Sequence, residues 1–267
     1  MLTMIESLNS PHVGRVKALI SSRGAKERSQ TGSFIAEGIQ CIKEALHSRT
    51  GPQLQTIYIT NSALDKFADV INQATCEILS ISDDVARAMS DTVTPQGIIA
   101  VCTIPRPELP IISSSSMKKF VYLSEIQDPG NAGTIIRSAD AFGFDAVLIS
   151  PNSVDIYSPK VVRSTVGSLW HIPVYQGISL KEIVSWNCQF IALDASADLP
   201  ISKVRADRSI VAIFGNEARG LNTEQDISDS KNSIIFVKIP MPGNAESLNL
   251  SAAASIVMYQ LANIPTS

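Results

Sequence analysis

The sequence contains no apolar run near the roughly 20 residues that a membrane-spanning helix requires, and its start lacks the basic-then-apolar order of a signal peptide. We therefore expect a soluble, cytoplasmic protein. Metal ligands are also scarce, because the three histidines lie far apart and the cysteines form no C-x-x-C pair. The cysteines, all in apolar segments, are Cys41, Cys76, Cys102 and Cys188. We expect buried thiols, with no metal and no disulfide.

Excess positive charge is missing as well. A formal net charge of −3 argues against a surface built for nucleic acid. The first 33 residues are an exception, because five basic residues stand there against two acidic ones, a local net charge of +3. The five are Arg15, Lys17, Arg23, Lys26 and Arg28. Such a basic arm predicts contact with RNA phosphates, although the solvated face of a helix would have the same composition.

Strand and helix patterns alternate along the first hundred residues. A helix is predicted from Pro11 to Ile20, whereas the polar segment from Ser21 to Gly32 is typical of a mobile loop. After Phe34-Ile-Ala, the predicted helices are 39–46, 62–71 and 83–89, and the predicted strands are 56–60, 77–81 and 97–102. This order indicates a small α/β domain.

A segment rich in proline and serine then interrupts the alternation, and it reads as a linker. Beyond it, the predicted strands are 120–124, 146–150, 172–175, 190–194, 209–214 and 234–239, and the predicted helices are 134–142, 159–169, 180–186 and 248–261. Short βα repeats of this kind build a parallel sheet covered on both faces. We predict a first domain at 1–103, a linker at 104–117 and a second domain at 118–267.

Three loops of the second domain carry residues suited to ligand binding. In the last of them, an apolar strand ending at Ile239 leads through Pro-Met-Pro-Gly243 to a helix rich in small residues, where Ser247 and Asn249 can cap free N–H groups. Gly215 and Gly243 would let a ligand approach the backbone closely. Neither loop reads G-x-G-x-x-G, which disfavours an NAD-type α/β enzyme.

The three loops together resemble the signature motifs of the SpoU or TrmH group of RNA 2′-O-ribose methyltransferases. The motifs are Gln127-Asp-Pro-Gly-Asn-Ala-Gly-Thr-Ile-Ile-Arg137, Ile213-Phe-Gly-Asn-Glu-Ala-Arg-Gly-Leu221 and Ile239-Pro-Met-Pro-Gly-Asn-Ala-Glu-Ser-Leu-Asn-Leu-Ser251. The first domain is also similar to the family's small substrate-binding domain, since Phe34-Ile-Ala-Glu-Gly-Ile opens it and Thr94-Pro-Gln-Gly-Ile-Ile closes it.

The resemblance implies a fold and a donor site. In this family the methyl donor S-adenosylmethionine lies in a deep trefoil knot, with its adenine held largely by main-chain groups. Carried over by motif, the donor-binding residues are Gly215, Asn216, Ile239 and Leu248, and Leu193 at the end of the preceding strand is added to them. No metal is needed, because the sulfonium of the donor is already activated and catalysis is mostly alignment.

The resemblance also implies catalytic residues. Arg137 matches the family's catalytic arginine, and Asn131, Glu217, Ser247 and Asn249 match its other polar motif positions. An arginine stays protonated in proteins and is a poor base, so orienting the 2′-hydroxyl and a nearby phosphate is the easier role for Arg137. Asn131 either closes an Asx turn or binds the ribose. Arg163 is a further candidate for contact with an RNA phosphate.

We therefore expect an RNA 2′-O-methyltransferase whose first domain selects the substrate and whose second domain performs the chemistry. Ribosomal RNA, most simply 23S rRNA, is favoured over tRNA because the separate first domain resembles those of rRNA-modifying members. A thiostrepton-resistance type of enzyme shares the plan, and a non-enzymatic RNA-binding or ribosome-assembly protein is the alternative of another class. The resemblance implies a homodimer, for which the terminal helix offers Leu250, Ala253, Ala254, Val257 and Leu261 at helical spacing.

Overall fold

The computed structural model describes residues 4–110, 112, 117–216, 219–221 and 234–264. These residues form two compact units. Unit 1 comprises Met1–Arg106 with Asp155–His171, and unit 2 comprises Pro107–Val154 with Ile172–Ser267. Within the described ranges, every helix falls short of the length and apolarity that crossing a bilayer demands.

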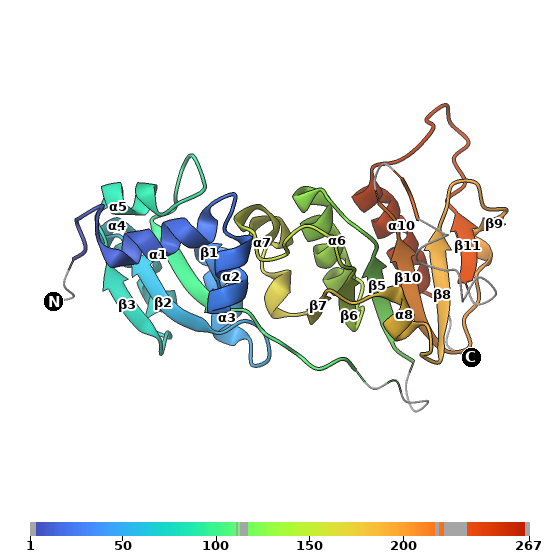
Figure 1. Cartoon of the computed structure of the whole chain (residues 1–267), viewed down its shortest axis with the longest axis horizontal. Helices are drawn as coiled ribbons and strands as arrows, with labels where there is room; N and C mark the ends of the chain where they lie inside the picture. Colours follow the sequence, from blue (N-terminus) through green and yellow to red (C-terminus); the bar gives the residue numbers. More distant parts are fainter. Residues whose placement is uncertain (1–3, 111, 113–116, 217–218, 222–233, 265–267) are drawn as a thin grey trace. The chain divides into compact units, whose positions relative to one another are not determined.

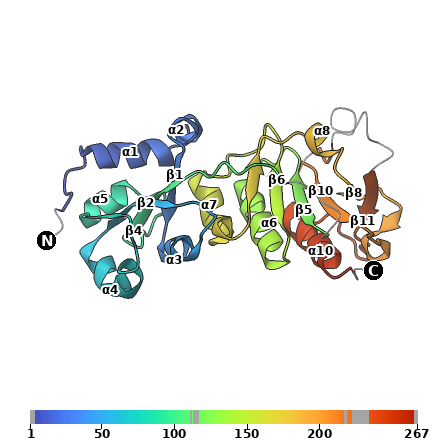
Figure 2. The same cartoon turned by 90° about the horizontal axis from the view of Figure 1, so that it is seen from below.

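Unit 1 is built on a four-stranded mixed sheet with the order β1-β4-β2-β3. Its strands are β1 (Ser33–Glu37), β2 (Leu54–Ile59), β3 (Glu77–Ser80) and β4 (Ile98–Thr103), and its helices are α1 (Pro11–Ile20), α2 (Ala25–Thr31), α3 (Ile39–His47), α4 (Asn61–Ile71), α5 (Asp83–Ala88) and α7 (Pro159–Thr165), followed by the 3-10 turn η1 (Ser168–Trp170). The apolar faces of α1 and α5 pack on Ile35, Tyr58 and Val101 of the sheet. Figure 2 shows α3 and α4 on the opposite face.

The predicted loop at 21–32 is wrong, because residues 25–31 form helix α2. The cause is Arg28, which is only 3% exposed. Its guanidinium contacts Asp155 at 2.7 Å and donates to the carbonyl of Leu19. A buried charge must be paired in this way, and the pairing fixes the backbone around it.

The segment Asp155–His171 was expected in the second domain, yet it packs with unit 1. Tyr157 and Trp170 stack against Phe34 with ring centroids 4.8 Å and 6.1 Å away, and the Trp170 indole donates to the carbonyl of Pro52 at 2.9 Å. The predicted helix 159–169 ends at Thr165, because Val166 and Gly167 adopt left-handed φ angles of 52° and 99°. Burial of large aromatic rings holds this segment in unit 1.

Unit 2 confirms the predicted α/β class with a parallel sheet of seven strands, in the order β7-β6-β5-β10-β8-β11-β9. The strands are β5 (Lys119–Leu123), β6 (Ala146–Ile149), β7 (Val174–Gln176), β8 (Cys188–Leu193), β9 (Leu199–Pro200), β10 (Ser209–Phe214) and β11 (Ile234–Lys238). The other elements among the described residues of this unit are α6 (Pro129–Ala141), α8 (Leu180–Ile183), the 3-10 turn η2 (Ile201–Lys203) and α10 (Leu250–Ala262). Figure 2 shows α6 and α10 on one face of the sheet and α8 on the other.

The apolar face of α10 faces inward rather than toward a partner. Ala253, Ala254, Val257 and Leu261 are all buried within unit 2, so they are unavailable as the expected dimer surface. Helix α10 packs on α6, and the hydroxyls of Ser138 and Ser255 meet between them at 2.8 Å. The trefoil knot that the resemblance implies stays a prediction, since residues 222–233 lie outside the described chain.

Candidate functional site

A cavity of about 340 Å³ lies at the carboxyl edge of the parallel sheet of unit 2. The loops that follow β8, β10 and β11 line it, together with the first turns of α6 and α10. Open α/β sheets hold their ligands at this edge. Seven of the ten residues predicted for donor binding or catalysis line the cavity, namely Asn131, Leu193, Asn216, Ile239, Ser247, Leu248 and Asn249.

Two asparagines join the helices at the cavity wall. Asn249 is the N-cap of α10, because its Oδ1 accepts from the N–H groups of Ser251 at 2.9 Å and Ala252 at 3.3 Å. Its Nδ2 donates to Oδ1 of Asn131 at 3.1 Å. Asn131 lies in the first turn of α6, where its N–H donates to the capping carboxylate of Asp128 at 2.7 Å. The predicted Asx turn is thus closed by Asp128, which leaves the Asn131 side chain at the cavity.

Gly215 does not line the cavity, and the structure gives it a different use. A Cβ there would lie 2.4 Å from the carbonyl carbon of Gly220 and 2.5 Å from the nitrogen of Leu221. The chain after β10 folds back in a tight hairpin, in which Asn216 and Gly220 exchange backbone hydrogen bonds of 2.9 Å and 2.8 Å. The glycine therefore permits close approach of the protein's own backbone. At Gly243, by contrast, a Cβ would meet no atom within 4 Å.

Arg137 lies on the exposed side of α6 and is not among the residues that line the cavity. Within the described part of the chain, its guanidinium has no hydrogen-bond or ion-pair partner. A cation in this state is available to an external anion. Glu217, the remaining predicted catalytic residue, lies outside the described residues.

Two charged residues near the cavity were not predicted as site residues, although Arg219 lies within the second motif. Glu125, between β5 and α6, binds Arg219 of the hairpin after β10, with Oε2 and Nη2 2.8 Å apart. Glu125 also adopts a left-handed φ of 47°, which is uncommon for a residue other than glycine. No local pattern could have revealed this pair, because the two residues are 94 positions apart.

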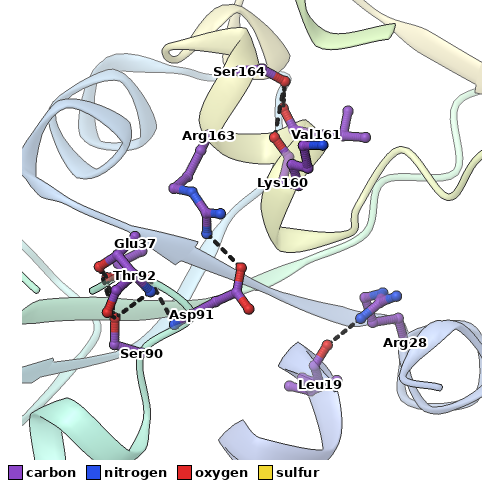
Figure 3. A network of polar contacts seen from close by, with 10 residues as sticks. All are labelled: Leu19, Arg28, Glu37, Ser90, Asp91, Thr92, Lys160, Val161, Arg163 and Ser164. Atoms are coloured by element: carbon purple, nitrogen blue, oxygen red, sulfur yellow. Dashed lines mark hydrogen bonds and ion pairs between the residues drawn. The ribbon is translucent and has the colours of Figure 1, made fainter. Parts of the chain in front are cut away.

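The predicted RNA-binding residues divide by exposure. Arg15, Lys17, Arg23 and Lys26 are exposed on and after α1, as an RNA-contacting surface requires. Arg28 is buried and paired, so it is a structural residue and its predicted RNA contact is wrong. Figure 3 shows its guanidinium turned toward Leu19.

Arg163 of α7 is half-buried, with 32% of its side chain exposed. Its Nη1 forms an ion pair with Oδ2 of Asp91 at 2.9 Å, but the N–H is not aligned for a hydrogen bond. Figure 3 places this contact beside Glu37, whose carboxylate accepts hydrogen bonds from the hydroxyls of Ser90 and Thr92. An anion approaching Arg163 would therefore compete with Asp91.

The cysteines are free, and three of the four are buried. Burial raises the pKa of the Cys41 thiol to about 11 and that of Cys188 to about 11. Thiols in this state are poor nucleophiles and poor metal ligands. Among the described residues, no group of three or more His, Cys, Asp or Glu side chains could hold a metal ion.

The cavity lining suits a nucleoside-like ligand. Leu193, Ile239 and Leu248 offer an apolar surface, and they lie at the ends of strands and in loops, where main-chain groups are available to the polar edge of a base. The carboxamides of Asn131 and Asn249 provide donors and acceptors in the same lining. Neutral amides of this kind bind hydroxyls without repelling a ligand of either charge.

Comparison with known proteins agrees with this geometry. Residues 118–259 match the SpoU rRNA methylase family, and residues 13–100 match the MRM3-like substrate-binding domain. The chain is 31% identical to the 23S rRNA (guanosine(2553)-2′-O)-methyltransferase RlmP of Bacillus subtilis, over 97% of this chain and 99% of that protein.

Two solved structures are also similar. The AdoMet-bound rRNA methyltransferase from Sinorhizobium meliloti has a TM-score of 0.81 at 26% identity, covering 97% of this chain and 96% of that one. The SpoU methyltransferase AviRb from Streptomyces viridochromogenes, in complex with AdoMet, has a TM-score of 0.83 at 26% identity, covering 95% and 97%. The chain therefore belongs to the SpoU rRNA methylase family.

Proposed function

We propose that this protein transfers a methyl group from S-adenosylmethionine to a ribose 2′-hydroxyl of 23S ribosomal RNA. The observation that carries the proposal is the cavity, in which six predicted site residues from the three sequence motifs, together with Leu193, meet at one edge of the sheet. The relatives named as 23S rRNA 2′-O-methyltransferases support the acceptor, and the structures with AdoMet support the donor.

Leu193, Ile239 and Leu248 would hold the adenosine part of the donor against the apolar wall. Asn216, which is 9% exposed and fixed by its hairpin, would fix the donor's orientation. S-Adenosylmethionine supplies, when bound, a methyl group already activated by a sulfonium. The protein's task is then to hold an acceptor oxygen in line with that methyl group, and such positioning is worth up to about 7–11 kcal/mol.

The residues that would bind the acceptor ribose and its phosphate are Asn131, Ser247, Asn249 and Arg137. The linked carboxamides of Asn131 and Asn249 would orient the ribose hydroxyls by hydrogen bonds. The Arg137 guanidinium would bind the neighbouring phosphate in a bidentate manner and thereby fix the ribose. A role for Glu217 beside Arg137 stays a prediction. The 2′-hydroxyl proton would leave to a phosphate oxygen or to water.

A homodimer would complete the site. Arg137 points from the exposed side of α6 and does not line the cavity of its own unit, so a second copy would have to present it. The outer surface of α10 supports this arrangement, because Ile256 and Tyr259 are 43% and 58% exposed. The Tyr259 ring packs on Phe142 at the end of α6, with centroids 5.8 Å apart. We propose that this outer surface, rather than the buried face of α10, forms the interface.

The dimer is tested by light scattering. Wild-type protein at micromolar concentration should show twice the 28.7 kDa mass of the chain. The double variant Ile256→Asp/Tyr259→Asp should be monomeric, because it places two charges in an apolar contact. Tyr259→Phe, which keeps the ring, should remain dimeric. A monomeric wild-type protein would refute the proposal.

We propose a cytoplasmic location and a division of labour in which the N-terminal domain, 1–103, selects RNA while 118–267 carries the chemistry. The two family matches, at 13–100 and 118–259, support these boundaries. The exposed charges at Arg15, Lys17, Arg23 and Lys26 suit RNA phosphates.

Mapping of ribose methylation across total RNA from cells with and without the gene tests the function. Loss of one 2′-O-methyl mark in 23S rRNA is expected. Loss of a mark in tRNA alone would reassign the substrate, and gain of thiostrepton sensitivity would indicate a resistance enzyme. Calorimetry that detects no binding of S-adenosylmethionine would favour the non-enzymatic RNA-binding alternative.

A further inference from the structure

We infer that Glu125 and Arg219 are positioning residues that hold Asn216 in place at the wall of the donor cavity. The inference rests on the proposed function, because it concerns the donor that this cavity would bind. Neither residue lines the cavity, so each would act through Asn216.

The first support is a closed ring of contacts around the Asn216 carboxamide. Its Nδ2 donates to the backbone carbonyl of Glu125 at 2.9 Å, and its Oδ1 accepts from the backbone N–H of Arg219 at 3.1 Å. The side chains of Glu125 and Arg219 then join each other at 2.8 Å. Both ends of one carboxamide are thus held by two residues that are themselves tied together.

The second support is the backbone of Glu125. Its φ of 47° lies in the left-handed region, where a side chain costs energy and glycine does not. The peptide is anchored there, since its N–H donates to Oγ of the buried Ser150 at 2.6 Å and its carbonyl also accepts from Nε2 of Gln127 at 3.1 Å. A glycine would satisfy the same backbone contacts without strain. A glutamate at this strained position, where a glycine would fit more easily, therefore indicates that its carboxylate has a use.

The third support is the place of the pair in the chain. Glu125 belongs to the loop that leads into α6 and Asn131, and Arg219 belongs to the hairpin that carries Asn216. The ion pair consequently ties together two of the three motif loops. An exposed ion pair contributes little to global stability, because 68% of the Arg219 side chain is open to solvent. Removing the pair should instead change how firmly the two connected loops are held in position.

Calorimetric titration with S-adenosylmethionine on the full-length protein tests the inference. The variants are Arg219→Gln, Glu125→Gly and the two together, each with its thermal midpoint measured. The matched control is Lys118→Gln, which breaks the pair of Lys118 with Asp145 before the start of β5, whereas Glu125 follows the end of that strand. Glu125→Gly keeps the backbone contacts and removes the strain, so a purely structural residue would show no loss on this change.

Each single variant should weaken donor binding roughly threefold to tenfold, with a midpoint within about 2 °C of wild type. The double variant should bind about as weakly as either single variant, because both remove one interaction. The exchange Glu125→Arg/Arg219→Glu should recover part of the affinity, and Lys118→Gln should bind like wild type. Wild-type affinity in Glu125→Gly and Arg219→Gln would overturn the inference alone, whereas a wild-type protein that binds no donor would overturn the proposed function as well.

Discussion

Unit 1 and unit 2 each contain an arginine that the sequence marks as a candidate for RNA, and the two residues are used in opposite ways. Arg28 of unit 1 is 3% exposed and paired with Asp155, whereas Arg137 of unit 2 is exposed on α6. A buried guanidinium must satisfy its donors within the protein, and it then organises the chain around it. An exposed guanidinium without a described partner keeps its donors available to a ligand.

The same contrast extends to polar side chains in general. In unit 1 the carboxylate of Glu37 accepts hydrogen bonds from the hydroxyls of Ser90 and Thr92, and these bonds fix a loop. In unit 2 one set of polar contacts lies at the carboxyl edge of the sheet, where Asn131 and Asn249 meet over a cavity. Polar contacts thus fix a loop in unit 1 and line the candidate ligand site in unit 2.

The largest expected effect is on Arg137. Arg137→Ala should lower the rate of methyl transfer by roughly 10²–10³-fold, because it removes the cation assigned to the acceptor phosphate. Affinity for S-adenosylmethionine should stay within a few fold. Single-turnover kinetics measures the first quantity and calorimetry the second.

Thr134→Ala, a change on the exposed side of the same helix, is the control and should keep wild-type activity. Arg137→Lys should recover only part of the rate, since an ammonium group lacks the planar fork of the guanidinium. An active Arg137→Ala enzyme would contradict the assignment.

Arg28 should matter for stability instead. Arg28→Ala leaves Asp155 without its partner and opens a gap between α1 and α2, so the free energy of unfolding should fall by about 3 kcal/mol. This figure is at the lower end for buried pairs because 24% of the Asp155 side chain is exposed. Chemical denaturation measures the loss. Arg23→Ala, an exposed change just before α2, is the control and should lower the free energy of unfolding by less than about 0.5 kcal/mol. Equal losses of stability in the two variants would contradict the structural role assigned to Arg28.

Local signals predicted most of the elements, and α1 shows why. Ser10 caps the helix, Pro11 occupies its first position, and Val13, Val16 and Leu19 form its buried face, so cap, start and apolar face all lie within ten residues. Helix α2 has no such face, because its sequence is polar. It depends on the contact of Arg28 with Asp155, 127 residues away, which no local pattern reports.

The candidate site shows the same limit. Asn131, Asn216 and Asn249 were predicted because they belong to motifs whose order and spacing are specific, and the structure brings them together at one cavity. The pairing of Glu125 with Arg219 was missed because it joins two loops across 94 residues. The φ of Glu125 was missed because nothing in the sequence distinguishes a strained glutamate from an ordinary one.

The basic surface of unit 1 should contribute a smaller, salt-dependent effect. The triple variant Lys17→Gln/Arg23→Gln/Lys26→Gln should weaken RNA binding roughly tenfold or more at moderate salt and reduce the slope of log K against log salt by roughly 2 to 3, because each lost phosphate contact contributes about 0.7–0.9. Donor binding should be unchanged. Lys66→Gln, an exposed change on α4 across the sheet, is the control. An unchanged salt slope in the triple variant would show that RNA is read elsewhere.

The smallest expected effect concerns the alkylation rates of one buried thiol in each unit. Cys41 of unit 1 and Cys188 of unit 2 both have a pKa raised by burial to about 11, so at pH 8 only about one thiol in 10³ would be ionised in the native state. Both should therefore be alkylated slowly at pH 8, and each rate should rise about tenfold per pH unit up to pH 10. Partly exposed Cys76, whose pKa burial also raises, should react first. Mass spectrometry of the labelled peptides gives the rates. A rate for either thiol that stays constant between pH 8 and pH 10 would contradict this expectation, because it would show that local opening rather than ionisation limits alkylation.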